Sequence, residues 1–243
     1  MGLKDKVLKQ AVPKHIAIIL DGNGRWAKKK GLERSFGHKQ GAVNLKTITL
    51  ECLSLGVEVL SVYAFSTENW KRPKDEIDYL MNLPKVFENE YKESFDEYDV
   101  RVVFSGRRDR LSRENVELLE RVEKESALRK GIILNVCLDY GSKDEIVQAT
   151  KQIASLVKAN QLDVDAINEL TIQSHLYTKD LPDVDLLIRT SGELRLSNYL
   201  LWQVAYAEFY FTKVHWPAFN RKQLYKAIRD YQNRNRKFGG LKG

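Results

Sequence analysis

The chain has 243 residues, of which 43% are hydrophobic and 30% charged, so it can bury the core of one α/β domain or of two small ones. Its 40 Lys and Arg against 33 Asp and Glu give a net charge of +7, which favours an anionic partner such as nucleic acid, anionic lipid or a phosphorylated small molecule. The N-terminus lacks the apolar region of a signal peptide, and no apolar run reaches the roughly 18 residues of a membrane span, so we expect a cytoplasmic protein that at most touches the membrane surface.

Apolar runs of strand length alternate with longer stretches of helical period along the chain. The strand-like runs are 15–20, 57–65, 100–104, 131–138, 185–190 and 208–212. The helical stretches are 38–55, 75–98, 111–128, 143–159, 164–175 and 220–236. Continuously apolar strands that alternate with helices are typical of a parallel sheet covered on both faces. Because no repeat or linker interrupts the pattern, we expect residues 1–243 to form a single α/β domain with a mostly parallel six-stranded central sheet flanked by helices.

Polar segments follow three of the predicted strands. They read DGNGRW from residue 21, STENWKRP from residue 66 and RTSGELRLS from residue 189. In a parallel sheet the ligand site lies beyond the carboxyl ends of the strands, so these segments should share one rim. The sequence therefore predicts a site there without help from any known family.

The first segment places a lone acid beside groups suited to an anion. Asp21 ends an apolar run, and Gly22 and Gly24 allow close approach of the backbone to a ligand. The segment is neither a Walker loop nor G-x-G-x-x-G. Taken alone, the segment is explained by a tight turn, or by a helix cap at Asp21, about as well as by an anion site. The nearby Arg25 and Arg34 favour an anion site.

The third segment follows the same logic. Arg189 and Arg195 flank a Ser-Gly turn, and Ser197 follows. Two guanidiniums and a hydroxyl suit the oxygens of a diphosphate through charge-assisted hydrogen bonds, whereas solvated loop arginines are the alternative. Because the segment follows a buried strand, diphosphate binding is favoured over solvated loop arginines.

Few carboxylates accompany these two predicted anion sites. Besides Asp21, the candidates for a rim cation site are Glu68, Glu76, Glu193 and Glu208. Magnesium usually takes one or two protein carboxylates plus substrate phosphates, so this sparse supply fits Mg2+. Cys52, Cys137 and the scattered histidines lack zinc-site spacing, and both cysteines read as buried thiols. Two phosphate-bearing substrates and one magnesium ion indicate a group transfer in which diphosphate leaves.

The helical stretch 75–98 is unusually apolar. Its apolar residues are Ile77, Leu80, Met81, Leu83, Val86, Phe87, Tyr91 and Phe95, with Pro84 in the interior. Core packing is the commoner reason for such a face, but a kinked helix that is apolar on two sides also suits the wall of a hydrophobic cavity.

Four long stretches resemble the cis-prenyltransferase family, and most closely its bacterial undecaprenyl diphosphate synthases. They read HIAIILDGNGRWA, GHKQG, VYAFSTENWKRP and DLLIRTSGELRLSNYLLWQVAYAEFYF. The resemblance implies condensation of farnesyl diphosphate with successive isopentenyl diphosphates to a polyprenyl diphosphate, the lipid carrier precursor for cell-wall synthesis. It further implies a Mg2+-dependent homodimer with a hydrophobic tunnel, and transient membrane-surface contact for product release.

The resemblance also assigns roles to matching positions. Asp21 matches the magnesium-binding aspartate, and Glu208 the second carboxylate assigned to the metal. Gly22, Asn23, Gly24 and Arg25 match the cradle of the allylic diphosphate, with Trp26, Arg34 and His38 beside it. Ser66, Thr67, Glu68, Asn69, Trp70 and Arg72 match the segment over the reacting carbons. Arg189, Arg195, Leu196 and Ser197 match the isopentenyl diphosphate site.

Two chemical expectations accompany these matches. The family position at Asn69 is described as the proton acceptor, but a neutral amide is a poor base, so we expect a diphosphate oxygen to take the proton while Asn69 orients it. Trp26 and Trp70 are expected to shield the cation-like carbon from water.

Several positions depart from the family pattern. Leu20 replaces Met, Leu194 stands where some members have His, and Ser142 and Lys143 replace Gly-Arg after Tyr-Gly. Lys237 replaces the Arg before Phe-Gly, which weakens a bidentate contact across a dimer.

A nucleic-acid-binding module is the competing interpretation of the charge. It requires clustered Lys and Arg with exposed aromatic side chains on one face. The informative arginines instead follow strands beside glycine turns, which favours small diphosphates over nucleic acid.

Overall fold

The computed structural model describes residues 2–234 and, within the helix after the second strand, all side chains but those of 87 and 89–91. The helices are α1 (Leu3–Val7), α2 (Asn23–Lys29), α3 (Arg34–Leu55), α4 (Lys74–Glu97), α5 (Arg113–Ser126), α6 (Ser142–Lys158), α7 (Glu169–Gln173) and α8 (Arg221–Gln232). The strands are β1 (His15–Ile19), β2 (Val59–Ser66), β3 (Val100–Ser105), β4 (Ile132–Tyr140), β5 (Leu186–Arg189) and β6 (Glu208–Phe211). Short 3-10 helices are η1 (Thr67–Lys71), η2 (Val164–Ala166) and η3 (Trp216–Ala218).

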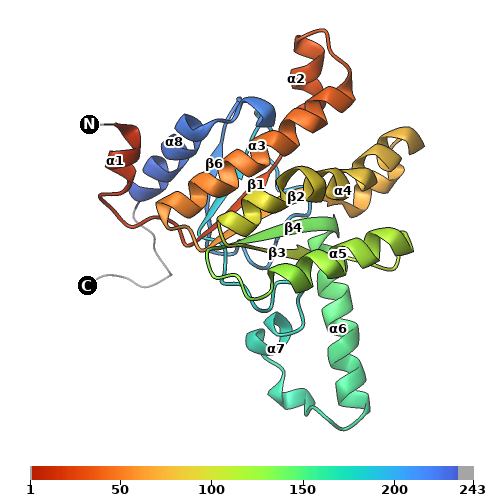
Figure 1. Cartoon of the computed structure of the whole chain (residues 1–243). Helices are drawn as coiled ribbons and strands as arrows, with labels where there is room; N and C mark the ends of the chain where they lie inside the picture. Colours follow the sequence, from red (N-terminus) through yellow and green to blue (C-terminus); the bar gives the residue numbers. More distant parts are fainter. Residues whose placement is uncertain (1, 235–243) are drawn as a thin grey trace.

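All six predicted strands form, and they make one parallel sheet in the order β3-β4-β2-β1-β5-β6 (Figure 1). The chain is thus a single α/β domain with an all-parallel sheet, as the alternation of strands and helices predicts. After β1 the chain adds strands first on one side, through β2, and later on the other, through β5. A crevice opens at the carboxyl ends where the strand order reverses, and Asp21 and Arg189 flank it.

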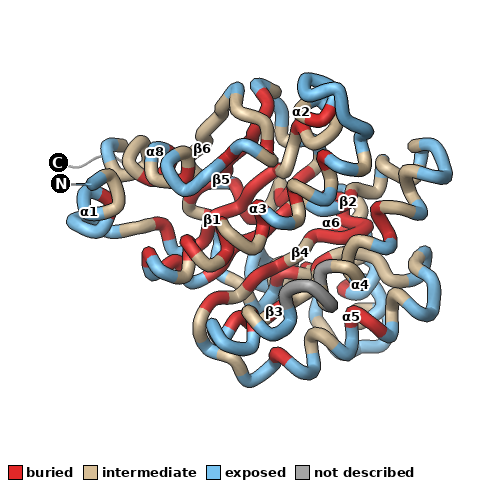
Figure 2. The backbone as a smooth tube through the Cα atoms, turned by 45° about the horizontal axis from the view of Figure 1, so that its top comes forward, coloured by how far each residue is buried: buried red, intermediate tan, exposed pale blue. Residues whose placement is uncertain are grey.

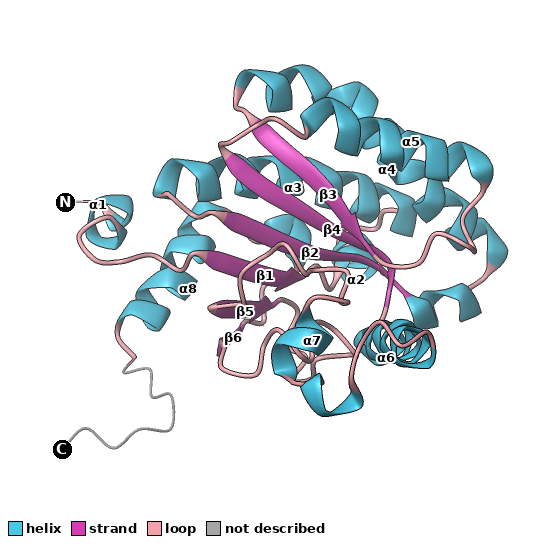
Figure 3. Cartoon of the chain, turned by 90° about the horizontal axis from the view of Figure 1, so that it is seen from below, coloured by secondary structure: helices cyan, strands magenta, loops and turns pink. Residues whose placement is uncertain are grey.

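Helices cover both faces of the sheet (Figure 3). On one face, Ile16 and Ile18 of β1 pack into a cluster with Ile48 of α3 and Ile228 of α8. On the other face, Ala17 and Ile19 pack with residues that follow β5, and α6 and α7 lie on this side. Figure 2 shows the buried strands running through the middle of the molecule. The continuous apolar strands are therefore explained by burial on both sides.

The helix predicted over 164–175 is wrong as a single element. The segment instead holds η2 and the short α7, because Asn168 breaks the run and starts a new helix. Its side chain accepts a hydrogen bond from the backbone N–H of Thr171, as an N-cap residue does. Helix α3 begins four residues before the predicted start, and positions 235 and 236 of the last predicted helix lie outside the described residues. Within residues 2–234, no helix is long and apolar enough to cross a bilayer.

His15 begins β1 and is fully buried. One ring nitrogen lies 2.7 Å from the carbonyl oxygen of Pro182 and the other 2.7 Å from the hydroxyl of Ser61. Burial lowers the pKa of His15 from 6.5 to about 4, against the opposing effect of the Pro182 hydrogen bond. The imidazole is therefore neutral at pH 7 and acts as a structural link between strands.

Candidate active site

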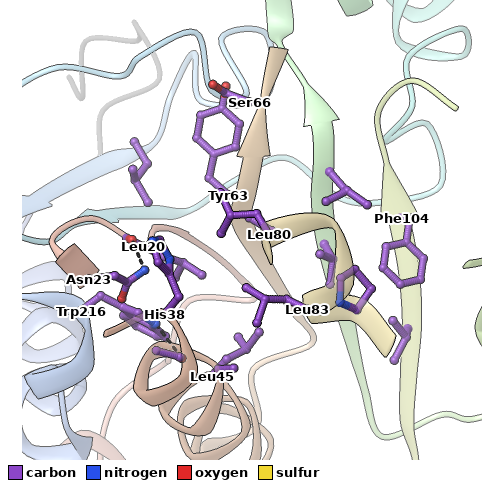
Figure 4. Close-up of a pocket in the computed structure, with 18 of the residues that line it drawn as sticks. Leu20, Asn23, His38, Leu45, Tyr63, Ser66, Leu80, Leu83, Phe104 and Trp216 are labelled. Atoms are coloured by element: carbon purple, nitrogen blue, oxygen red, sulfur yellow. Dashed lines mark hydrogen bonds between the residues drawn. The ribbon is translucent and has the colours of Figure 1, made fainter. Parts of the chain in front are cut away.

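A cavity of about 440 Å3 opens at the carboxyl edge of the sheet. Figure 4 shows its wall: side chains from β1, α3, β2, α4 and β3 surround one space. The labelled residues are Leu20, Asn23, His38, Leu45, Tyr63, Ser66, Leu80, Leu83, Phe104 and Trp216. Asp21, Arg189, Arg195 and Ser197 line the same cavity. One end is therefore ionic and the remainder largely apolar.

Asp21 lies at the ionic end, one residue beyond the apolar run of β1. Its backbone N–H donates to the hydroxyl of Thr190 at 2.9 Å, which ties it to the residue after β5. Its carboxylate accepts hydrogen bonds from Arg25 at 2.9 Å and from Arg189 at 3.0 Å. Burial acts to raise the pKa of Asp21, but these two guanidiniums lower it below its usual value. Asp21 is therefore an ionised carboxylate between two cations.

Arg189 ends β5 and is nearly buried. Its guanidinium donates to the hydroxyl of Ser197 at 2.8 Å and to the backbone carbonyl of Arg195, in addition to Asp21. The loop that carries these partners turns through left-handed backbone at Ser191 and Ser197, with φ of 78° and 51°. Non-glycine residues in this region cost free energy, so surrounding contacts hold the loop in place. Sequence and structure agree that Arg189, Arg195 and Ser197 converge.

Glu193 links the two arginine segments. It accepts from Arg25 at 2.7 Å and from Arg195 at 2.5 Å. Those hydrogen bonds, first from Arg195 and then from Arg25, lower the pKa of the Glu193 carboxyl. In this state the arginines are therefore neutralised by protein carboxylates, which an incoming diphosphate can replace as an acceptor.

The segment after Asp21 follows the sheet edge closely. Gly22 has φ of 97°, and a Cβ there would lie 2.1 Å from the hydroxyl of Ser191. It precedes α2, a helix that the glycine-rich sequence did not predict. Asn23 donates to the carbonyl of Leu20, and Gly24 leaves room for the Arg34 side chain, whose Nε would lie 3.2 Å from a Cβ at this position. The small residues thus keep the backbone open beside Asp21.

A second polar cluster forms at the start of α4 and includes His38 and Arg72, which line the cavity. Glu76 of α4 accepts hydrogen bonds from Arg34 at 3.0 Å and from Arg72 at 2.9 Å. His38 lies 3.9 Å from the same carboxylate. Burial lowers the pKa of His38 from 6.5 to about 4, although the Glu76 charge opposes it, so the ring is neutral at pH 7.

The segment after β2 is held by its own hydrogen bonds. The side-chain oxygen of Asn69 accepts from the backbone N–H of Ser66 at 3.0 Å, and both residues line the cavity. Glu68 accepts from Asn198 at 2.9 Å. Burial acts to raise the pKa of Glu68, but hydrogen bonds to its carboxylate, first that from Asn198, together lower this pKa below its usual value. Thr67 begins η1 between these residues.

Trp70 is anchored by residues that the sequence did not single out. Its indole N–H donates to Asp139 at 2.8 Å, and Asp139 also accepts from Arg110 at 2.9 Å. The indole packs edge-on against Phe65. Asp139 is fully buried at the end of β4 with φ of 48°. The sequence could have indicated Asp139, because it is an acidic residue at the end of a predicted strand and precedes Tyr140 and Gly141.

Some predicted site residues do not reach the cavity. Trp26 stacks on Phe36 with ring centroids 6.3 Å apart, and Trp70 turns to Asp139, so neither tryptophan lies in its wall. Leu196 packs in the cluster on the opposite face of the sheet. The backbone N–H of Lys143 donates to Asn198 at the start of α6. Lys237 lies outside the described residues.

Glu208 is not a rim carboxylate in this chain, so its predicted placement beside Asp21 is wrong. It is the first residue of β6 and lies opposite Leu186, three register positions before the pair Arg189–Phe211. At about 3.3 Å per residue, it is about 10 Å away along the strand. Its carboxylate accepts from Arg234 at 2.8 Å. Its metal role stays a prediction.

Three buried polar atoms at the ionic end have no hydrogen-bond partner within residues 2–234. They are the Asn23 side-chain oxygen, Nε2 of His38 and Nε of Arg189. Buried polar groups in proteins are almost always hydrogen-bonded, so these atoms indicate a polar ligand.

The residues at this end fit a divalent cation held mainly by its substrate. In the described part of the chain no group of three or more His, Cys, Asp or Glu forms a metal cage. Asp21 is ionised and adjoins arginines suited to phosphate oxygens. One carboxylate plus substrate phosphates is the donor set that Mg2+ commonly accepts.

Away from the ionic end, the wall of the cavity is largely apolar, with charged side chains along one side where α4 meets α5. Leu80, Leu83 and Pro84 of α4 line the cavity together with Phe104 of β3, which confirms that this helix lines a hydrophobic space (Figure 4). The cavity can therefore receive an elongated amphiphile with an anionic head at Asp21 and a hydrocarbon tail between helix and sheet.

Comparisons with known proteins agree with this arrangement. The family described as "Putative undecaprenyl diphosphate synthase" matches residues 19–239. An isoprenyl transferase of Streptococcus thermophilus is 50% identical over 234 residues, covering 95% of this chain and 94% of the relative. An isoprenyl transferase of Clostridium perfringens is 48% identical and covers 97% and 93%.

Solved structures of prenyl diphosphate synthases share this fold. Lavandulyl diphosphate synthase from Lavandula x intermedia, in complex with dimethylallyl diphosphate, matches with a TM-score of 0.91 and 35% identity, over 97% of this chain and 100% of that one. The structure titled "a probable undecaprenyl diphosphate synthase" from Campylobacter jejuni matches with a TM-score of 0.78 and 32% identity, over 95% and 100%.

Proposed function

The chain belongs to the undecaprenyl diphosphate synthase family of prenyltransferases, and from this premise we propose that it condenses farnesyl diphosphate with successive isopentenyl diphosphates to a cis-polyprenyl diphosphate of about undecaprenyl length. Its activity as an isoprenyl transferase follows from its family. The observation that supports the finer proposal is the contact of Asp21 with Arg25 and Arg189 at one end of a cavity whose remaining wall is largely apolar. We assign the whole of 1–243 to one catalytic domain.

The ionic end supports two diphosphate subsites. Gly22, Asn23, Gly24 and Arg25, with Arg34 and His38, are assigned to the allylic diphosphate. Arg189, Arg195 and Ser197 are assigned to isopentenyl diphosphate. Because the two sets meet at Asp21, the allylic carbon and the attacking double bond would lie side by side. Binding both substrates in this way makes the bimolecular step effectively unimolecular.

Asp21 is the protein group that we assign to a divalent cation shared with substrate phosphates. When bound, such a cation supplies Lewis-acid stabilisation of the departing diphosphate. Arg25 and Arg189 donate to the same oxygens as charge develops, and they are already oriented by Asp21.

The reaction balances as a substitution followed by loss of a proton. The allylic C–O bond breaks and its electron pair leaves with the diphosphate. The double bond of isopentenyl diphosphate then forms the new C–C bond, and a proton leaves the neighbouring carbon as the cis double bond forms. We assign that proton to a diphosphate oxygen, with the Asn69 amide as its orienting donor, because the amide oxygen already accepts from Ser66.

The apolar part of the cavity supports both protection and growth. Leu83 and Phe104 exclude water from the cation-like carbon, and the lengthening chain moves between α4 and β3. Each added isoprene unit buries about five carbons, worth at most about 4 kcal/mol at about 0.8 per CH2. We therefore propose that product release limits turnover.

We also propose a homodimer, which the family resemblance supports, and transient contact with the membrane surface, where a polyprenyl product has to arrive. The net charge of +7 would favour an anionic membrane. Sedimentation and vesicle flotation test these two statements separately from catalysis.

The central experiment is incubation with farnesyl diphosphate, labelled isopentenyl diphosphate and Mg2+, followed by sizing of the extracted lipid. We expect a polyprenyl ladder ending near eleven isoprene units in the wild type. Asp21→Ala should lower the rate about 10³-fold, because charge stabilisation at the leaving group is lost. A wild-type enzyme that makes no extractable lipid would refute the proposal.

A further inference from the structure

A row of four ion pairs joins α4 to α5 and the turn after it, within the described residues. The pairs are Lys85–Glu114 at 2.8 Å, Glu88–Arg121 at 2.9 Å, Lys92–Glu125 at 2.5 Å and Asp96–Arg129. Figures 1 and 3 show the two helices lying side by side on one face of the sheet. We call the last three pairs the ionic seam. The α4 members of the seam, Glu88, Lys92 and Asp96, are four residues apart, so they fall on one face of the helix.

The ionic seam lies over the hydrocarbon part of the cavity. Glu88, Lys92 and Asp96 of α4 line the same cavity as Leu83 and Phe95 of that helix. From the other side, Glu125 and Arg129 line it together with Leu118 and Val122 of α5. Lys85 and Glu114, the first pair, are absent from its lining. A space suited to a hydrocarbon tail therefore has a charged side wall, which no step of the proposed chemistry uses.

This wall is weaker than the rest of the contact between the helices. Nearer the mouth, Leu80 and Met81 of α4 share a buried cluster with Leu119 of α5. Along the ionic seam the exposure rises: the side chains of Lys92 and Glu125 are 47% and 40% exposed. Exposed ion pairs stabilise a fold only weakly, because water screens both partners. Near Leu80 the two helices share buried apolar packing. Along the seam, Phe95 of α4 and Val122 of α5 pack into the main core, and the helices are joined at the surface by the ion pairs.

An exposed apolar residue stands at the end of the seam. Leu128, beside Arg129, is 91% exposed, the largest value among the exposed large hydrophobic residues described. Lys124 and Lys130 flank the same turn. An isolated apolar side chain among cations suits contact with a detergent micelle or an anionic lipid surface.

We propose that the ionic seam is the lateral exit of the cavity, through which the finished polyisoprenoid tail passes between α4 and α5 to a lipid or detergent surface at Leu128. The proposal rests on the proposed function. Exit through the mouth would draw the whole tail past Asp21 and Arg189. Exit through the seam requires that three ion pairs separate, each of which has at least one partner that is 40% or more exposed. The tail then need not pass Asp21 and Arg189.

Charge reversal at Lys92 tests the proposal. Lys92→Glu faces Glu125 with a like charge and should hold the seam open. Without detergent, we expect the steady-state rate to rise about three- to tenfold, while the rate of the first-turnover burst stays unchanged. Lys92→Glu combined with Glu125→Lys restores the pair and should restore the wild-type rate. Lys85→Glu, on the same helices but off the cavity, is the matched control and should behave as wild type.

A covalent closure tests the same idea in the opposite direction. Cys52 and Cys137 are fully buried, and burial raises the pKa of both thiols, so cysteines placed at 92 and 125 can be labelled selectively. Bridging them with a short bismaleimide should slow steady-state turnover at least fivefold and leave the burst intact. Each single cysteine variant, treated with the same reagent, reports the effect of labelling alone.

Contrary outcomes are distinct. A Lys92→Glu enzyme that changes product length but not the ratio of burst to steady-state rate would make the seam an end wall and overturn the exit. A change confined to the melting temperature would make it structural only. A wild type without a burst would also contradict the proposal. A wild type that makes no polyprenyl lipid at all would instead refute the proposed function.

Discussion

Arginine–carboxylate pairs occur both at the ionic end of the cavity and in the ionic seam along its side, but they are built differently. At the ionic end, the side chain of Arg189 is 4% exposed and extends from a central strand to Asp21. At the seam, the side chain of Arg121 is 52% exposed and joins two surface helices through Glu88. The strand ends hold charge rigidly where a diphosphate would leave, whereas the helices meet through contacts that water weakens. The same residue types therefore hold the ionic end rigid, whereas at the seam they allow α4 and α5 to separate.

Replacing both arginines identically gives the largest expected effect. Arg189→Gln removes the nearly buried one of the two cations that hold Asp21 and leaves Arg25 alone with that partly buried charge. Breaking a buried pair typically costs about 3–5 kcal/mol, and here it should lower kcat/KM for isopentenyl diphosphate about 10³-fold. Arg121→Gln should change the free energy of unfolding by less than about 1 kcal/mol and should not slow the burst. Urea titration and single-turnover kinetics measure both. Equal losses at the two positions would remove the distinction between the ionic end and the seam.

The pH dependence of the free energy of unfolding reports on the two buried histidines. For His15 and His38, burial lowers the pKa from 6.5 to about 4. As the pH falls below 6.5, the unfolded chain takes up protons that the folded chain refuses until about pH 4. Stability should therefore fall over this window, by up to about 3 kcal/mol for each ring. Urea midpoints between pH 7 and 4 report it.

The variants His15→Gln and His38→Gln should each flatten part of that slope. His175, whose ring lies outside the sheet in α7's terminal turn, supplies the control substitution. A slope that persists undiminished in both variants would show that other groups govern acid stability.

Alanine substitution at two glycines should give a smaller effect, and comparing them separates backbone strain from crowding at the site. Gly22 and Gly56 both have left-handed backbone, with φ of 97° and 83°, but only Gly22 is crowded. Gly56→Ala should cost about 1–2 kcal/mol through the backbone alone and leave activity intact. Gly22→Ala adds a clash with Ser191 and should also lower kcat. If the two variants were equally active, the close approach at Gly22 would have no catalytic meaning.

The sequence was enough to predict the strands and the contact of Asp21 with the Arg189 segment. Both residues follow buried strands, and parallel strands end at one edge, so their meeting required only the fold class. The same rule, applied consistently, excludes Glu208 from that edge, because Glu208 begins its predicted strand rather than ending it. The error was to count Glu208 among the rim carboxylates although the predicted strand 208–212 starts with it.

Other features depend on packing that no local pattern encodes. The ionic seam pairs residues about 33 positions apart on two helices, and their facing sides are known only once the helices are placed on the sheet. Trp26 illustrates the same limit: its place in the motif suggested a cavity wall, but stacking on Phe36 directs it elsewhere. The short α2 was hidden because glycine and asparagine read equally well as a turn.

The most direct test of the central claim is a crystal structure with Mg2+ and a thiodiphosphate analogue of farnesyl diphosphate that does not ionise. The account predicts the diphosphate within hydrogen-bonding distance of Arg25, with the cation on Asp21 and the hydrocarbon between Leu83 and Phe104. A diphosphate bound away from Asp21, or a tail that leaves the space between α4 and β3 empty, would contradict it.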